Sequence, residues 1–153
     1  MSELDALYRE LILDHSKHPQ HFGLVDAGDA PAAPGTYGTS HQKNPVCGDE
    51  ITLRARVDGE SVADVTWEGR GCSISQASAS MLADLVADGG LSRAETLALI
   101  EGFREALRSR GQLELDEEVY GDAAALSGVS KFSARVKCAM LAWVALEDAI
   151  AKA

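Results

Sequence analysis

Cys47 and Asp49 stand two residues apart in a stretch with the composition of a turn. Pro45 restricts the backbone before the cysteine, and Gly48 permits a sharp bend after it, so the thiol is predicted at a turn just before a strand. A thiolate and a carboxylate at this spacing can grip one metal ion. The same residues also fit a small buried cysteine beside a turn aspartate.

Cys72 and Cys138 each lie where a helix is predicted to begin. Cys72 follows Gly71 at a strand-to-helix junction, and the partial positive charge of a helix N-terminus favours a thiolate there. Cys138 follows Arg135 and Lys137, two cations that the dipole disfavours near a helix N-terminus. They suggest a negative neighbour, such as a thiolate or an anionic metal site. Tight packing at Cys72 and plain surface charge around Cys138 are the alternatives.

Together the three cysteines and Asp49 supply three sulfurs and one oxygen, the number of ligands in a four-coordinate zinc site. Thiolate-rich ligation also suits iron–sulfur chemistry. An odd number of cysteines cannot all pair internally, so the thiols are predicted to be reduced, buried or metal-bound. His15, His18 and His21 cluster near the end of the first predicted helix, and we expect surface residues there rather than ligands.

The elements that must position these residues follow from the hydrophobic periodicity. Helical spacing predicts a first helix ended by Pro19, and alternation predicts a hairpin over 51–68 that turns at Asp58-Gly59. Residues 24–45 are expected to form a long loop with one short edge strand near 36–40. Three helices are expected after the hairpin: one from Ser73 or Ser75 to about 87, one capped by Ser92, and one capped by Ser133. The acidic stretch 111–128 is expected to be a solvated face or a surface insertion.

This order of elements predicts an α+β fold, with helices packed on one face of a small antiparallel three-stranded sheet. The 153 residues fit one domain, 1–153. The composition, 46% hydrophobic and 25% charged, is that of a globular chain, and the net charge of −10 argues against nucleic acid or an anionic membrane as partner. There is no apolar run long enough to span a bilayer and no signal-peptide core, so a cytoplasmic location is expected.

Four stretches of the sequence occur in the order found in one known family. They are Asp14-His15 with Pro19 and Gly23, then 44–49, then 71–75 with Ala77-Ser78, then 137–139. On these motifs the chain resembles the IscU/SufU family of iron–sulfur cluster assembly proteins, from about Tyr8 to Ile150.

Within that family the chain looks most like SufU. Lys137 stands where IscU scaffolds carry a histidine, and the Leu-Pro-Pro-Val-Lys motif of IscU is missing. The stretch 126–132 resembles SufU, whereas Ser133 stands where SufU commonly has a proline.

The resemblance implies a zinc ion held by Cys47, Asp49, Cys72 and Cys138. It implies that Cys47 accepts persulfide sulfur from a SufS-type cysteine desulfurase, stimulates that enzyme, and passes sulfur toward a downstream iron–sulfur scaffold. Arg135 and Lys137 would then be cations around the negatively charged metal site.

Two other functions remain open from the sequence. The same residues could assemble a [2Fe–2S] cluster, as in an IscU-like scaffold, with iron in place of zinc. Alternatively, zinc could be structural and the chain could only activate the desulfurase, without itself transferring sulfur.

Overall fold

One antiparallel sheet, whose three strands lie side by side in chain order, forms a layer of the molecule. The computed structural model describes residues 3–24, 34–45 and 48–153. The strands are β1 (Thr36–Asn44), β2 (Asp49–Asp58) and β3 (Ser61–Arg70). The predicted hairpin is confirmed as β2–β3. The predicted edge strand is longer than expected, because residues 41–44 continue the ladder until Asn44 pairs with Asp49.

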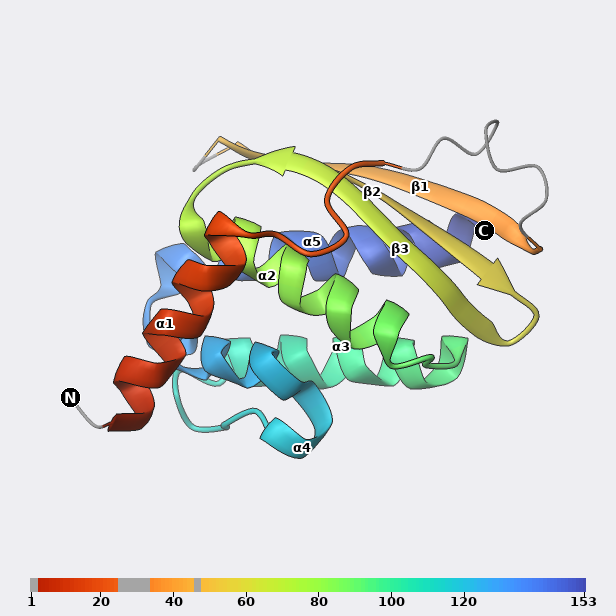
Figure 1. Cartoon of the computed structure of the whole chain (residues 1–153). Coiled ribbons are helices and arrows are strands. Elements are labelled where there is room, and N and C mark those ends of the chain that lie inside the picture. Colours follow the sequence, from red (N-terminus) through yellow and green to blue (C-terminus); the bar gives the residue numbers. More distant parts are fainter. Residues whose placement is uncertain (1–2, 25–33, 46–47) are drawn as a thin grey trace.

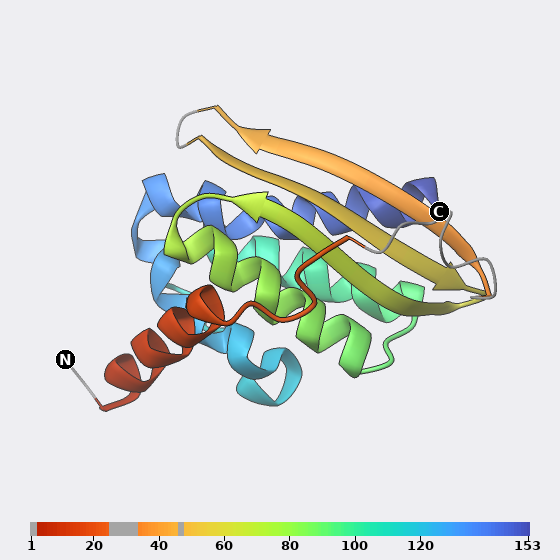
Figure 2. The same ribbon diagram turned by 45° about the horizontal axis from the view of Figure 1, so that its top comes forward.

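The helices lie on one side of this sheet, as Figures 1 and 2 show, so the predicted α+β architecture is confirmed. The helices are α1 (Glu3–Lys17), α2 (Ser73–Ala83), α3 (Arg93–Arg108), α4 (Glu117–Tyr120) and α5 (Ser133–Lys152), with a π-helical turn η1 (Asp84–Asp88) and a 3₁₀ segment η2 (Gly121–Lys131). Helices α2 and α5 pack against the strands, and α3 lies beyond them. No helix in the described ranges is long and apolar enough to cross a membrane.

The core lies between the sheet and the helices. Side chains of β2 alternate between buried and half-buried, which is the period of two that the sequence predicts. Phe103 of α3 stacks on Trp143 of α5 with ring centroids 3.7 Å apart. Gly38 lets β1 approach α5 closely, since a Cβ there would lie 1.8 Å from the carbonyl oxygen of Ala149. Such packing sets α5, and with it Cys138, against the sheet.

The stretch 111–128 is only in part the solvated surface that its acidic residues predict. Its acidic side chains are exposed, but Leu115, Tyr120 and the run 123–126 are buried in the core. The surface-insertion interpretation is therefore wrong. Four consecutive small or apolar residues (Ala-Ala-Ala-Leu) show no helical period, so their burial was hidden in the sequence.

Two other local expectations are corrected. His15 was expected at the surface, but it is buried: its Nδ1 lies 2.7 Å from Ser80 Oγ and its Nε2 lies 2.9 Å from Asp122 Oδ2. Ser133 is the first residue of α5 rather than its cap, because Phe132 occupies the N-cap position without a side-chain hydrogen bond.

Candidate metal centre

Three of the four predicted ligands meet at one end of the sheet. Asp49 begins β2, Cys72 is the N-cap residue of α2, and Cys138 lies in the second turn of α5. One carboxylate oxygen of Asp49 and the two sulfurs all lie within 4.8 Å of one another. Cys72 follows Asp49 by 23 positions, and Cys138 follows Cys72 by 66. The β3–α2 junction and the packing of α5 bring the three residues together.

The Asp49 carboxylate is buried and fixed in direction. Its residue is 1% exposed, and its Oδ1 accepts a hydrogen bond of 3.0 Å from the Cys72 amide. Its Oδ2 is also buried, yet no residue in the described part of the chain hydrogen-bonds to it. A buried carboxylate oxygen without a donor is costly, and a cation is the partner that compensates it best. This orphaned oxygen beside two thiols fits a metal site of mixed sulfur and oxygen ligands.

Gly71 makes room for this arrangement. A Cβ at this position would lie 2.3 Å from Asp49 Oδ1 and 2.5 Å from Ser75 Oγ. Ser75 in turn donates a 3.0 Å hydrogen bond to the Cys72 carbonyl and so ties down the first turn of α2. The position of Gly71 before Cys72 does not by itself predict this contact with the Asp49 carboxylate. The predicted helix start at Ser73 or Ser75 is one to three residues late, because Cys72 occupies the N-cap position.

Two thiols differ in their access to solvent. Cys72 is exposed, whereas Cys138 is 4% exposed and its Sγ lies 3.9 Å from the Ala134 carbonyl oxygen. Cys47, the predicted acceptor, lies outside the described residues. The described residues on either side of it are joined, because the Gly48 amide donates a 2.8 Å hydrogen bond to the Asn44 carbonyl, and Asn44 pairs with Asp49.

Arg135 and Lys137 are exposed on the first turns of α5. Within the described ranges neither side chain makes an ion pair, so both are available to a nearby negative charge. Arg135 also lines a groove of about 470 Å³ next to the site, together with Ile74 of α2 and Phe132, which is 61% exposed. The role of both cations at the metal site stays a prediction.

Comparisons with known proteins identify the family of the chain. Residues 7–139 match the model of the NifU-like N-terminal domain. The chain belongs to the IscU/SufU family.

Relatives within the IscU/SufU family match almost the whole chain. The chain is 40% identical to the zinc-dependent sulfurtransferase SufU of Bacillus subtilis (strain 168), over 99% of this chain and 94% of that protein. It is also 40% identical to the iron–sulfur cluster assembly scaffold protein IscU of Streptococcus pyogenes serotype M1, over 98% of this chain and 86% of that protein.

A solved structure confirms the fold. It is a candidate iron–sulfur cluster assembly scaffold protein for the SUF system from Fervidobacterium islandicum AW-1, with a TM-score of 0.78 and 32% identity over 92% of this chain and 94% of that one. The predicted resemblance to the IscU/SufU family is thus confirmed, and SufU is among its most similar members.

Proposed function

We propose that this protein is a zinc-dependent sulfurtransferase of iron–sulfur cluster assembly, which works in the cytoplasm with a SufS-type cysteine desulfurase. The observation that carries the proposal is the cluster of Asp49, Cys72 and Cys138, with its buried carboxylate oxygen that lacks a hydrogen-bond partner among the described residues. The likeness to a relative named zinc-dependent sulfurtransferase supports the choice of metal and activity.

In this proposal Cys47 completes a ligand set of three thiolates and one carboxylate. Bound zinc would keep the thiols deprotonated at neutral pH and protect them from oxidation. The four ligands would leave the site with two net negative charges. Arg135 and Lys137 lie on the same turns of α5 as Cys138 and would offset that charge.

Sulfur transfer is an exchange reaction at Cys47. Its thiolate attacks the outer sulfur of the persulfide that the desulfurase carries, a new sulfur–sulfur bond forms on Cys47, and the desulfurase cysteine leaves as a thiolate. The reaction needs no external oxidant or reductant. Cys47 suits the role of acceptor because it lies on a predicted turn, whereas Cys72 and Cys138 are held on α2 and α5. A downstream iron–sulfur scaffold would then take up the sulfur.

A second candidate function is an IscU-like scaffold on which a [2Fe–2S] cluster is assembled. The relative from Streptococcus pyogenes, named as a scaffold, is as similar as the one named as a sulfurtransferase, and thiolates bind iron as well as zinc. Lys137 favours sulfur transfer, since it stands where the resemblance to IscU scaffolds predicts a histidine.

Metal analysis of protein purified from its own host separates the two functions. Colourless protein with about one zinc per chain supports the sulfurtransferase, and a coloured protein that contains iron and acid-labile sulfide supports the scaffold. Desulfurase assays with cysteine variants then identify the role of each cysteine. Cys47→Ser should abolish stimulation of the desulfurase, and Cys72→Ala and Cys138→Ala should lose both zinc and stimulation. Stimulation that survives in Cys47→Ser would indicate a protein that only activates the desulfurase.

A further inference from the structure

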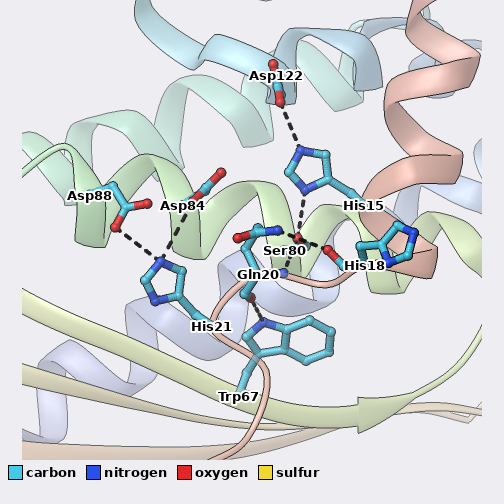
Figure 3. Close-up of polar contacts among 9 residues, drawn as sticks. All are labelled: His15, His18, Gln20, His21, Trp67, Ser80, Asp84, Asp88 and Asp122. Carbon is cyan, nitrogen blue, oxygen red and sulfur yellow. Dashed lines mark hydrogen bonds and ion pairs between the residues drawn. The ribbon is translucent and has the colours of Figure 1, made fainter.

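A second group of side chains of the types that bind metal ions lies just beyond the other end of α2, and it contains no sulfur. His21 follows α1, and Asp84 and Asp88 lie on the π-helical turn η1 (Figure 3). The Nε2 atom of His21 lies 3.8 Å from Asp84 Oδ1 and 3.3 Å from Asp88 Oδ1. One potential ligand atom from each residue lies within 4.8 Å of the other two.

The backbone on both sides of His21 is fixed before any ligand arrives. The Gln20 amide donates to Ser80 Oγ at 2.7 Å, and the Gln20 carbonyl accepts from the Trp67 indole at 3.0 Å. The His21 carbonyl accepts from the Trp67 amide at 3.3 Å, and the Gly23 amide donates back to the Trp67 carbonyl at 2.8 Å. These bonds tie the segment to β3 and α2, so the imidazole is aimed at η1 at little entropic cost to binding.

The helix geometry places the two carboxylates side by side. A π-helical turn accommodates Asp84 and Asp88 on the face that meets His21. Burial and a hydrogen bond with Asp88 raise the pKa of Asp84, and the same hydrogen bond lowers the pKa of Asp88. Two carboxylates this close repel each other when both are ionised, and a divalent cation can neutralise both.

We propose that His21, Asp84 and Asp88 form a second, exchangeable site for a divalent first-row transition-metal ion such as Zn²⁺. One imidazole and two carboxylates are ligands that such ions accept, and three protein ligands leave positions open for water. The side chains are 23%, 37% and 64% exposed, respectively, so an ion can enter directly from solvent. Asp84 follows Cys72 by twelve positions along the helix, about 18 Å at 1.5 Å per residue, so the site is independent of the cysteine cluster and of the proposed sulfur transfer.

The test is a calorimetric titration of Zn²⁺ into the untagged full-length chain. We expect two binding events: a tight one at the cysteine cluster and a weaker one at the second site. His21→Ala should remove the weaker event or reduce its affinity by more than about tenfold, since even groups that only orient a ligand typically change affinity 10- to 100-fold. Asp88→Asn should do the same with little risk to folding, because this side chain is well exposed.

His18→Ala is the matched control, because His18 lies in the same segment but is exposed and is not part of the group. This variant should bind as the wild type does, and circular dichroism should show that all variants are folded. A wild type with no weaker event, or a weaker event of equal affinity in His21→Ala and Asp88→Asn, would overturn the proposal. The outcome is distinct from a failure of the cysteine site, since that failure removes the tight event and leaves the weaker one.

Discussion

The order of stability between the wild type and Asp49→Asn should differ between chelated and zinc-loaded protein. The variant keeps an oxygen to accept from the Cys72 amide, but it removes the charge of a side chain that is 1% exposed and whose Oδ2 has no hydrogen-bond partner among the described residues. A buried polar group left without a partner costs about 1–3 kcal/mol, and more when it is charged. Without metal, Asp49→Asn should therefore be more stable than the wild type by about 1–2 kcal/mol. That difference corresponds to about 2–8 °C in Tm for a chain of this size.

With zinc the order should be the opposite. Free zinc at a thousand times the Kd stabilises the wild type by about 4 kcal/mol, and a hundredfold loss of affinity removes about 2.7 kcal/mol of that gain. The loss exceeds the stability that the variant gained by removing the charge. The net effect should leave the wild type more stable.

The assay is thermal unfolding of both proteins with excess zinc and with a chelator, read by circular dichroism. Glu50→Gln is the control, because Glu50 is the next residue of β2 and pairs with His41 at 3.4 Å instead of facing the cysteines. The Tm of Glu50→Gln should differ from that of the wild type by the same amount with zinc and with chelator. If the Tm of Asp49→Asn also differs from that of the wild type by the same amount under both conditions, Asp49 is not a ligand and the reasoning fails.

Three further predictions test the surroundings of the site. Gly71→Ala should displace the Asp49 carboxylate and weaken zinc binding about 10- to 100-fold in chelator competition. The control Gly128→Ala should bind zinc like the wild type, because its methyl group meets no neighbour within 4 Å. Arg135→Ala should fold normally, lose zinc affinity 10- to 100-fold and slow sulfur transfer; wild-type values in both assays would make Arg135 a plain surface cation. Ser80→Ala should lower the free energy of unfolding in urea by about 2–3 kcal/mol, because the buried His15 imidazole and the part-buried Gln20 amide both lose their hydrogen-bond partner. An unchanged midpoint would contradict that contact network.

The fold could be predicted where the sequence has a clear period. The alternation over 51–57 predicts β2 with its buried face, and the predicted cap Ser92 marks the start of α3. The sequence did not reveal the end of β1, because His41, Gln42 and Lys43 are polar and join the sheet through their main chain. Burial of the run 123–126 was hidden for a related reason: it depends on partners that are distant in sequence.

The candidate site, like the fold, could be predicted from the sequence only in part. Residue types and local turn signals made Asp49, Cys72 and Cys138 candidate ligands, and the structure brings these three together. Their mutual positions depend on contacts across the fold, such as the space that Gly71 leaves for the carboxylate. The grouping of His21 with two aspartates on η1 could not be predicted either, because it joins segments more than 60 residues apart in sequence.

The central claim is that Cys47 receives sulfur directly from the desulfurase. The most direct measurement is peptide mass spectrometry after a single turnover of the desulfurase with the zinc-loaded protein, with persulfides trapped by alkylation. The proposed function predicts that the first added sulfur is found on the peptide that contains Cys47. Sulfur found first on Cys72 or Cys138, or on none of the three cysteines, would contradict it.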